Sequence, residues 1–468
     1  MTAALSTARL DRRDLRGHMT EHSELDRFLA EHPDTTHLDA VLFDLCGNAY
    51  GKRMPLGHMR NFFDAGSPIC AAMSLVDVQG NTADPMGYGF SDGDPDASIR
   101  PLPGTLAAVP WSEGLAQVLC EPRHALTGEA FWYDPRTVLA RTVSVLHEAG
   151  LRPVVAAELE FYLIDPQRGE DGAPLPVRSP LTGIPESGGK VLSLAKLDEY
   201  RAVILAIEAA CKLQALPCST VISEYGAGQF EINLEHRDDP LRAADEACLL
   251  RRVVQAVARQ FGMEATFLSK PFPDQAGSGL HIHASMLDGD GRNLFDDRAE
   301  AGNATLGHAV AGLQATMAEG MALFAPNLNV FRRFTANNFT PVTRDWGENN
   351  RSVAFRVPVS SGASRRVEHR ISGAEANPYL VIAAVLAGMH YGIENRLDPG
   401  SAHGGNAGVE VDPDLPLTPW DSIRALRAAT ILPRWLGDDY PAIYASVKEA
   451  EFAAFMEQIS RREFEWYL

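Results

Sequence analysis

Several stretches of the chain alternate polar and apolar side chains with the period of two that is typical of a half-buried β-strand. They are residues 153–164, 228–236, 279–286 and 366–372. In the first stretch, Glu158 and Glu160 share one face of the predicted strand with Tyr162, and the apolar residues between them share the other face. A strand places two such carboxylates about 6 to 7 Å apart, which suits ligands of neighbouring cations.

The polar faces of these predicted strands, together with the turn before the second strand, are rich in carboxylates and histidine. The candidate metal ligands are Glu158, Glu160, Glu224, Glu231, His281 and Glu368. A solvated strand face is the alternative, but such faces favour Thr, Lys, Ser and Arg. Because no cysteine accompanies these ligands, Mg²⁺ or Mn²⁺ fits them better than structural zinc does.

Helical patterns alternate with the predicted strands. Asp134 and Pro135 combine an N-cap with a proline at the first helical position, and they begin an apolar pattern of helical spacing that ends at Gly150. Two further helices are predicted at residues 379–391 and 448–459. The region after residue 110 therefore mixes long helices with strands.

The first part of the chain has a different pattern. From about residue 21 to 110, short apolar runs such as 40–45 and 69–76 are interrupted by Gly, Pro, Asn and Asp, which predicts a small strand-rich unit. Residues 1–20 are polar and rich in arginine, and we expect them to form an N-terminal arm. The predicted domains are therefore 21–110 and 111–468.

Arginines gather between residues 332 and 370. This segment contains eight arginines, no lysine and three acidic residues, in a chain whose formal net charge is -19. The use of arginine alone favours planar, bidentate recognition of phosphate or carboxylate, with an exposed basic surface as the alternative. Cations beside arginines are the arrangement that phosphoryl transfer requires. No P-loop motif and no G-x-G-x-x-G motif is present to hold a nucleotide.

The composition restricts the partners of the protein. Of 468 residues, 45% are hydrophobic and 22% are charged, as in an ordinary globular protein with a large core. The acidic net charge opposes nonspecific binding to nucleic acid or to an anionic membrane. The cysteines form no C-x-x-C pair, and the apolar run 380–389 is far shorter than the ~18 residues of a membrane span. We therefore expect a cytoplasmic protein with no nucleic-acid or membrane partner.

Beyond these patterns, the chain resembles the glutamine synthetase family from about Asp44 to the C-terminal Leu468. The motifs that carry the resemblance are Asp44…Gly47…Gly51-Lys52, Glu158-x-Glu160, Glu224…Gly228-Gln229-x-Glu231, Lys270-Pro271, Gly277-Ser278-Gly279-Leu280-His281-Ile282-His283, Asn350-Arg351-Ser352, Arg356-Val357-Pro358, Arg366-Val367-Glu368-His369-Arg370 and Ala376-Asn377-Pro378-Tyr379-Leu380. They occur in the family's order.

The resemblance implies an α+β fold, with a small N-terminal β-grasp domain followed by a large catalytic domain built on a curved antiparallel sheet. It implies that Glu160, Glu224 and Glu231 hold one divalent cation, and that Glu158, His281 and Glu368 hold a second. It assigns the glutamate substrate to Gly277, Arg333, Arg351 and Arg370. It assigns the phosphates of ATP to Arg351, Arg356, Arg366, His283 and Ser285.

The resemblance also implies a two-step ligation. The γ-carboxylate of glutamate attacks the γ-phosphate of ATP, and a nitrogen nucleophile then displaces phosphate from γ-glutamyl phosphate. Asp44, Arg351 and Glu231 are the expected catalytic residues, and Asp44 is the best candidate for deprotonating the nucleophile. Family members usually stack two hexameric rings into a homododecamer, in which Asp44 would serve the active site of a neighbouring subunit.

Two departures from the family concern the nitrogen nucleophile. Ammonia-using members carry a glutamate on a flap after the first substrate arginine, and Phe339 stands at that position here. A family tyrosine that shapes the ammonium pocket falls near Leu192. Both changes replace polar partners of a small cation by apolar side chains, which suit the carbon chain of an organic amine. Family drift and a different alignment of the flap are the alternatives.

We therefore predict a γ-glutamyl-amine ligase that resembles the γ-glutamylputrescine and γ-glutamylpolyamine synthetases of polyamine catabolism. Its substrates would be glutamate, ATP and a primary amine. A true glutamine synthetase that uses ammonium is the first alternative, because Asp44 and the complete set of metal ligands are retained. A catalytically silent structural or regulatory homologue is the second, but such a protein has no physical need for six convergent metal ligands.

Overall fold

The computed structural model describes residues 24–468, so the arm predicted at 1–20 lies outside the described residues. Contacts divide the chain into two compact units. The smaller unit comprises the described residues from 24 to Leu42, Ala49–Ala71 and Asp96–Ala130, and the larger unit comprises Phe43–Asn48, Ala72–Pro95 and Phe131–Leu468. The division at residue 110 stays a prediction.

The smaller unit is built on a sheet with the strand order β2-β1-β6-β4-β3, in which β5 also pairs with β6. Its elements are β1 (His37–Phe43), β2 (Ala49–Pro55), α2 (Leu56–Ala65), β3 (Ser67–Cys70), β4 (Asp96–Pro101), β5 (Ala107–Ala108) and β6 (Leu115–His124). β1 runs parallel to β6, whereas β4 is antiparallel to both β6 and β3. The helix α2 buries Met59, Phe62 and Phe63 in the core of this unit.

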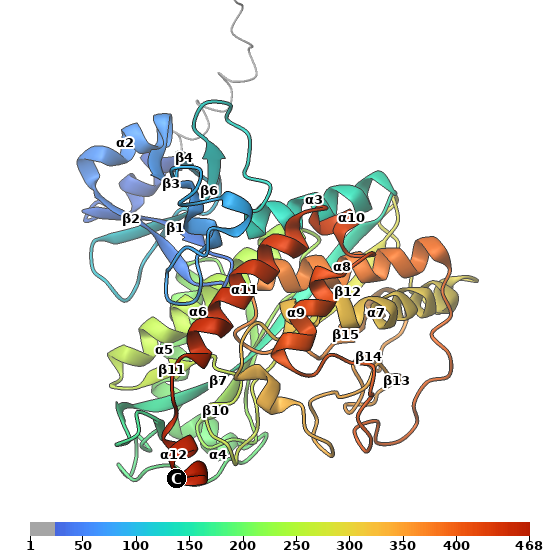
Figure 1. Ribbon diagram of the computed structural model, residues 1–468. Helices are drawn as coiled ribbons and strands as arrows, with labels where there is room; N and C mark the ends of the chain where they lie inside the picture. The colour runs from blue at the N-terminus through green and yellow to red at the C-terminus, as the bar shows by residue number, and fades with distance from the viewer. Residues whose placement is uncertain (1–23) are drawn as a thin grey trace, which may run out of the picture. The chain divides into compact units, whose positions relative to one another are not determined.

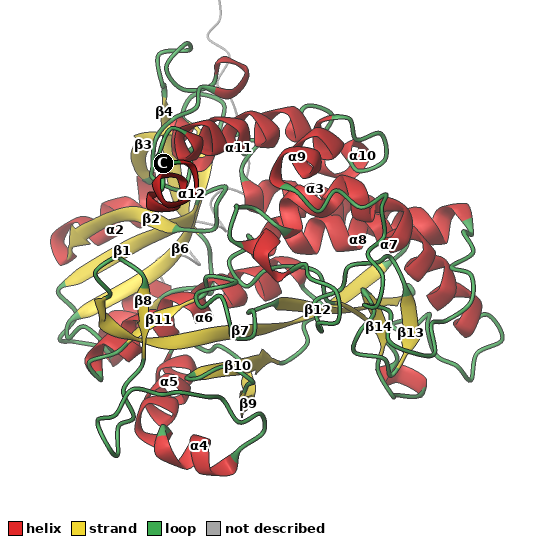
Figure 2. Ribbon diagram, turned by 60° about the horizontal axis from the view of Figure 1, so that its bottom comes forward, coloured by secondary structure: helices red, strands yellow, loops and turns green. Residues whose placement is uncertain are grey.

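The larger unit contains a second sheet, with the order β13-β14-β15-β12-β7-β10-β9 and with β8 and β11 paired to β7. Its strands are β7 (Arg152–Arg168), β8 (Pro174–Pro176), β9 (Cys218–Ser223), β10 (Gln229–Leu234), β11 (Glu264–Thr266), β12 (Leu280–Leu287), β13 (Trp346–Glu348), β14 (Phe355–Val357) and β15 (Val367–His369). The strand β7 is antiparallel to β10 and to β12. Figure 2 shows β7 and β12 as long curved strands at the centre of this unit.

Helices flank this sheet (Figure 1). They are α3 (Pro135–Glu148), α4 (Leu194–Glu199), α5 (Arg201–Leu213), α6 (Pro240–Gln260), α7 (Gly302–Phe324), α8 (Pro378–Asn395), α9 (Pro419–Arg427), α10 (Pro433–Leu436), α11 (Tyr440–Met456) and α12 (Arg461–Tyr467). Single 3-10 turns occur at η1 (Ala71–Leu75), η2 (Pro85–Gly87), η3 (Val330–Arg333) and η4 (Gly362–Ser364). The helix α6 packs on β7, and α8 packs on β12 and on α7.

The close approach of α7 to α8 depends on glycine. A Cβ atom on Gly312 would lie 2.0 Å from the carbonyl oxygen of Gly388. Because backbone cannot give way as a flexible side chain can, any other residue at Gly312 would push the two helices apart.

The predicted α+β class is confirmed, and most of the predicted elements are present with shifted ends. The helix α3 begins at the predicted cap, where the Asp134 side chain accepts from the N–H groups of Arg136 and Thr137. The helix predicted at 448–459 is the second half of α11, which begins at Tyr440 because the buried face of the helix extends upstream. The predicted run 366–372 forms the shorter strand β15, Val367–His369.

The run 69–76 is a further correction, because its strand ends at Cys70 and a 3-10 turn follows. Ala71, Ala72 and Leu75 of that turn are buried, so the apolar run reflects burial rather than strand pairing. Within residues 24–468, no helix has both the length and the apolar composition that crossing a membrane requires.

Candidate active site

Strand register brings the predicted metal ligands to one face of the larger unit's sheet. Glu160 on β7 is the antiparallel partner of Glu231 on β10. Two residues earlier on β7, Glu158 is the partner of His281 on β12. Because side chains of paired residues point to the same face of a sheet, carboxylates and imidazole from three adjacent strands meet there.

Three groups of these side chains have ligand atoms that all lie within 4.8 Å of one another. The groups are Glu160, Glu224 and Glu231; Glu158, Glu231 and His281; and Glu158, His283 and Glu368. The first group is the set expected for one cation. The set expected for the second cation is divided between the other two groups, although Nδ1 of His281 lies 3.3 Å from an oxygen of Glu158 and 4.0 Å from an oxygen of Glu368. All these side chains form one cluster, here called the carboxylate cluster.

Burial and the charges of neighbouring carboxylates raise the pKa of two members of the first group, Glu231 and Glu224. Burial, followed by the charges of the neighbouring carboxylates, raises the pKa of Glu231 to about 9. Burial and the charge of Glu160 raise the pKa of Glu224 to about 7. Glu231 therefore holds a proton at neutral pH unless a cation neutralises the charge around it. This oxygen-rich set of donors therefore fits hard divalent cations.

Glu368 binds two arginines at the edge of the carboxylate cluster. It is 1% exposed and accepts a hydrogen bond from Nη1 of Arg356 at 2.6 Å and another from Arg370. Burial acts to raise the pKa of Glu368, but the charge of Arg370, followed by those of the nearby histidines, outweighs it and lowers the pKa to about 2. Glu368 therefore stays ionised and holds both guanidinium groups beside the cluster.

Arg333 contributes a buried cation that forms no salt bridge with an acid among residues 24–468. It is 3% exposed, its Nη1 donates to the carbonyl oxygen of Ile371 at 3.1 Å, and its Nε has no hydrogen-bond partner among the described residues. Gly277 leaves room for it, because a Cβ atom there would lie 2.7 Å from Cγ of Arg333. A buried guanidinium with an unused donor is suited to an anionic ligand such as a carboxylate.

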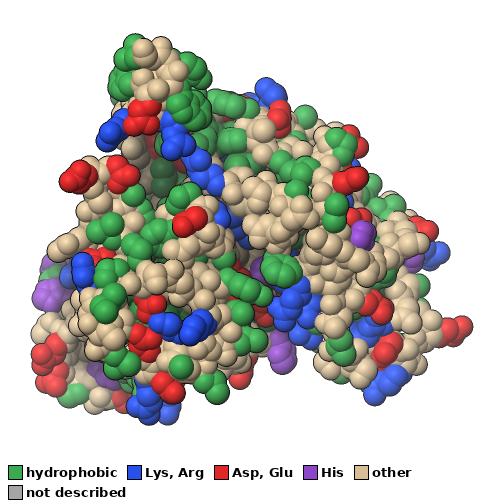
Figure 3. Space-filling model, turned by 90° about the horizontal axis from the view of Figure 1, so that it is seen from below, with side chains coloured by type: hydrophobic (Ala, Val, Ile, Leu, Met, Phe, Trp, Pro, Cys, Tyr) green, Lys and Arg blue, Asp and Glu red, His purple; other side chains and the backbone are tan. Residues whose placement is uncertain are grey.

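Some of the residues that are expected to bind the nucleotide phosphates lie close to one another. His283 joins the carboxylate cluster through Nε2, which lies 2.8 Å from an oxygen of Glu158, and its Nδ1 accepts a hydrogen bond from Nε of Arg366 at 3.1 Å. Ser285 is buried two residues further along β12. Arg351 is exposed, but its charge acts on the pKa of Glu224. Figure 3 shows basic side chains beside a hollow on the face that it draws.

The two residues expected to face the amine lie near Glu224. The ring of Phe339 packs against that of Tyr225, with centroids 6.1 Å apart and planes at 32°. Tyr225 directly follows Glu224 in the turn between β9 and β10. Leu192 is 66% exposed, and its N–H donates to the carbonyl oxygen of Ser223 at 2.8 Å. The structure therefore brings the segments that carry Phe339 and Leu192 to the turn that carries a predicted metal ligand, Glu224.

No periodic pattern singled out Tyr225, because it lies in a turn. The available signal was its place next to Glu224 in a glycine-rich segment. Its ring contact with Phe339 spans more than a hundred residues of sequence, so only the structure reveals it.

Asp44 lies in a tight turn that belongs to the larger unit. Its carboxylate accepts from the N–H of Asn48 at 2.8 Å, and its carbonyl oxygen accepts from Nδ2 of Asn377 at 2.9 Å. Burial raises the pKa of Asp44 to about 6, although the hydrogen bonds from Asn48 oppose this. Within the described part of the chain, no hydrogen bond joins Asp44 to the carboxylate cluster.

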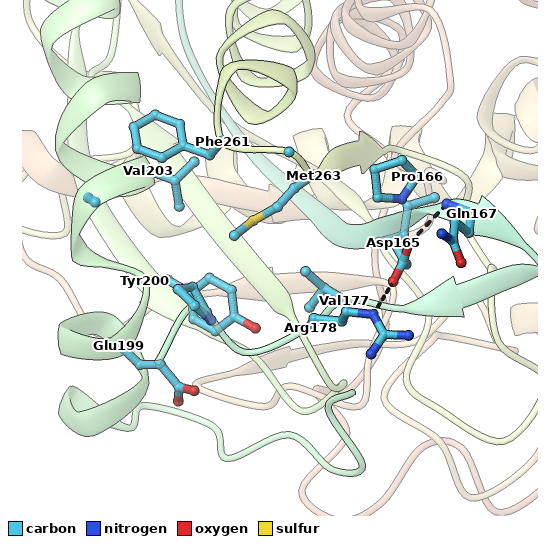
Figure 4. Close-up of a pocket in the computed structure, with 14 residues that line it drawn as sticks. Asp165, Pro166, Gln167, Val177, Arg178, Glu199, Tyr200, Val203, Phe261 and Met263 are labelled. Atoms are coloured by element: carbon cyan, nitrogen blue, oxygen red, sulfur yellow. Dashed lines mark hydrogen bonds and ion pairs between the residues drawn. The ribbon is translucent and has the colours of Figure 1, made fainter. Parts of the chain in front are cut away.

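A separate cavity of about 550 Å³ lies near the ends of β7 and α5. Figure 4 shows Asp165 directed toward Arg178, with Tyr200, Val203 and Met263 around the opening. Nε of Arg178 donates to Asp165 at 2.8 Å. No member of the carboxylate cluster lines this cavity. The chemistry of the side chains, rather than the size of a cavity, therefore identifies the candidate site.

Comparison with known proteins gives matches over nearly the whole chain. Residues 132–467 match the family model "Glutamine synthetase, catalytic domain". The chain is 37% identical over 448 residues to γ-glutamylputrescine synthetase PuuA of Escherichia coli, covering 95% of this chain and 94% of that protein. It is 33% identical over 398 residues to a glutamate–isopropylamine ligase of a Pseudomonas species, covering 83% and 84%.

A solved structure of GmaS without ligand superposes with a TM-score of 0.80 and 27% identity, covering 94% of this chain and 98% of that one. The curved sheet that carries the candidate site is therefore part of a known architecture.

Proposed function

The chain belongs to the glutamine synthetase family, and from that premise we propose that it is an ATP-dependent ligase joining the γ-carboxylate of glutamate to a primary organic amine. Putrescine, other polyamines and alkylamines form the proposed substrate class. The observation that carries the proposal is the 37% identity to a γ-glutamylputrescine synthetase over 95% of this chain. The apolar Phe339 beside Tyr225 supports it, because ammonium needs polar partners and an amine carbon chain does not.

The carboxylate cluster supports a requirement for divalent cations, which the family shares together with the use of ATP. We assign one cation, Mg²⁺ or Mn²⁺, to Glu160, Glu224 and Glu231, and a second to Glu158, His281 and Glu368. When bound, such cations neutralise phosphate oxygens and polarise the phosphoryl group. The raised pKa values of Glu224 and Glu231 fit this assignment, because a cation relieves the repulsion among the carboxylates.

The arginines hold the two anionic substrates. We assign the glutamate substrate to Gly277, Arg333, Arg351 and Arg370, and the phosphates of ATP to Arg351, Arg356, Arg366, His283 and Ser285. Nε of Arg333, Arg356 and Arg370 is buried and has no partner among the described residues, which leaves donors for these anions. Guanidinium groups fixed before the reaction stabilise charge that develops on the transferred phosphoryl group without having to reorganise.

Asp44 is the proposed base for the second step. An alkylammonium ion must lose a proton before it attacks γ-glutamyl phosphate, and a carboxylate is a suitable acceptor. Because Asp44 has no hydrogen bond to the carboxylate cluster of its own chain, we propose that it serves a neighbouring subunit in a homododecamer of two hexameric rings. We place the enzyme in the cytoplasm, and assign it no nucleic-acid or membrane partner.

The test is ADP release by the purified protein with ATP, Mg²⁺ and glutamate. The amines to compare are ammonium, putrescine, spermidine, a short monoalkylamine, ethanolamine and an aromatic amine. We expect at least one organic amine to have a kcat/KM well above that of ammonium. A preference for ammonium would identify a glutamine synthetase instead, and no ADP release with any amine would identify a silent homologue.

A pair of glutamate variants controls this experiment. Glu231→Gln removes one negative oxygen from the carboxylate cluster and should abolish ADP release. Glu264→Gln changes a partly exposed glutamate on β11 that pairs with Arg168, away from the cluster, and should leave the rate unchanged. Equal activity of the two variants would contradict the assigned role of the cluster.

A further inference from the structure

Two exposed aromatic rings meet beside the carboxylate cluster. Tyr225 and Phe339 are each 55% exposed, and their ring centroids are 6.1 Å apart. Tyr225 is bonded directly to Glu224, and a hydrogen bond from the N–H of Tyr225 is one of the interactions that lower the pKa of that carboxylate. One member of the aromatic pair, Tyr225, therefore directly follows a predicted metal ligand in the sequence.

The backbone around each ring is fixed independently of the other ring. A Cβ atom on Gly189 would lie 2.0 Å from the carbonyl oxygen of Tyr225, so the glycine-rich segment packs directly on the backbone of Tyr225. On the other side, the N–H of Asn337 donates to the carbonyl oxygen of Gly408 at 2.7 Å, which anchors the segment that carries Phe339. The two rings thus come from separate anchored loops and leave much of their surface open.

We propose that Tyr225, together with Phe339, binds the carbon chain of the amine substrate and determines the preference for alkylamines over ammonium. The inference rests on the proposed function and adds Tyr225 as a specificity-determining residue of that site. The substrate class that it selects is a primary amine with a chain of several methylene groups next to the reacting nitrogen.

The physical argument is the removal of apolar surface from water. Each methylene group that leaves water strengthens binding roughly fourfold, and ammonium has none to bury. Two tilted rings offer faces that accept methylene groups without a specific hydrogen bond. The affinity for an amine should therefore increase with each added carbon, whereas ammonium, which has no carbon, should bind no more tightly because of the rings.

The alternative is that Tyr225 has only a structural role and stabilises the contact between the two loops. A purely structural role would lower the activity with every amine by the same factor, because the site as a whole would be disturbed. A substrate-binding role would lower the activity in proportion to the length of the amine. A homologous series of amines separates the two roles.

The experiment measures kcat/KM for ammonium, methylamine, ethylamine, propylamine, butylamine and putrescine with the full-length enzyme. In the unchanged protein, log(kcat/KM) should rise with the number of carbons. In Tyr225→Ala, the ratio of butylamine to ammonium should fall about tenfold or more, mainly through the KM of the amine. Tyr225→Phe should keep the slope, because it keeps the ring.

Phe455→Ala is the matched control, because Phe455 is 54% exposed on α11, and it should leave the slope unchanged. If Tyr225→Ala does not fold, as judged by circular dichroism and the melting temperature, Tyr225→Leu and Phe339→Leu test the same slope. An unchanged slope in folded Tyr225→Ala or, where that variant does not fold, in Tyr225→Leu overturns the inference while leaving the proposed function intact. A preference for ammonium in the unchanged protein overturns the proposed function itself.

Discussion

Glu160 on β7 and Glu231 on β10 are direct partners in an antiparallel ladder, so two carboxylates lie next to each other on one face of the sheet. Like charges in such a pair destabilise the sheet. Burial and these neighbouring charges raise the pKa of Glu231 to about 9. The two carboxylates repel each other when both are ionised, and a bound cation would reduce this repulsion.

The affinity for a divalent cation should therefore rise with pH. Because Glu224 and Glu231 have raised pKa values, of about 7 and 9, a cation must displace protons from them below those pH values. We expect roughly tenfold tighter binding of Mn²⁺ per pH unit between pH 7 and 9, for each proton released. Calorimetric titration at pH 7, 8 and 9, in buffers of different ionisation enthalpy, measures both affinity and proton release.

In Glu231→Gln the pH dependence above pH 7 should flatten and the affinity should fall. Glu264→Gln serves as the surface control and should bind Mn²⁺ as the unchanged protein does. Binding that is independent of pH in the unchanged protein would contradict the pKa assignment of Glu231.

The contact between Gly277 and Arg333 gives a second prediction. A Cβ atom in Gly277→Ala would lie 2.7 Å from Cγ and 3.2 Å from Cδ of Arg333, so the guanidinium must move away from its present position. Displacement of a substrate-orienting group by about 1 Å can cost on the order of 100-fold in rate. We expect the KM for glutamate to rise at least tenfold, with the KM for ATP changed much less.

Gly289→Ala is the control for this variant, because a Cβ atom at Gly289 has no heavy atom within 4 Å apart from those of its two chain neighbours. Steady-state kinetics with glutamate and ATP varied separately distinguishes the two effects. Equal changes in both KM values would indicate a general disturbance rather than the displacement of Arg333.

Much of this site could be predicted from alternation alone, and the rest could not. The faces of β7, β10 and β12 follow from a period of two, so Glu158, Glu160 and His281 were recognisable as a polar set. Alternation within a strand does not determine which strands become neighbours. The pairing of Glu160 with Glu231 therefore needed either the structure or a resemblance to a family.

Segments without periodicity were harder to interpret. Tyr225 and Phe339 lie in loops that are held by contacts distant in sequence, and no local rule brings such residues together. The run 69–76 was misassigned beyond Cys70 because a buried 3-10 turn and a buried strand share the same apolar composition.

A third prediction concerns stability and a buried acid that is not a member of the carboxylate cluster. Asp245 on α6 is 1% exposed, and it accepts hydrogen bonds from Arg136 Nε at 3.0 Å and from the Tyr379 hydroxyl at 2.7 Å. It thereby ties together α3, α6 and α8. Asp245→Ala removes a buried charged acceptor from the guanidinium of Arg136 and from the Tyr379 hydroxyl, and should lower the free energy of unfolding by about 3 to 5 kcal/mol.

The matched control is Asp290→Ala, which removes an exposed partner of Arg292 and should change the free energy of unfolding by less than about 1 kcal/mol. Denaturant unfolding followed by circular dichroism measures both values. A loss below about 1 kcal/mol for Asp245→Ala would show that the three helices are held by packing alone.

The last prediction tests whether Asp44 acts on a neighbouring subunit. The turn of Asp44 is tied to Asn377 of the same chain, and none of its hydrogen bonds reaches the carboxylate cluster within the described residues. Asp44→Asn and Glu231→Gln should each be inactive as pure proteins, because each removes a different half of the proposed site. If the site is shared between subunits, assemblies formed from equal amounts of both variants should regain about a quarter of the wild-type activity, since half of the subunits supply each intact half.

The mixture must be dissociated and reassembled, and a mixture that is never dissociated is the control. If the reassembled mixture stays inactive although light scattering shows restored assembly, Asp44 serves the site of its own chain, and the turn must move to reach it.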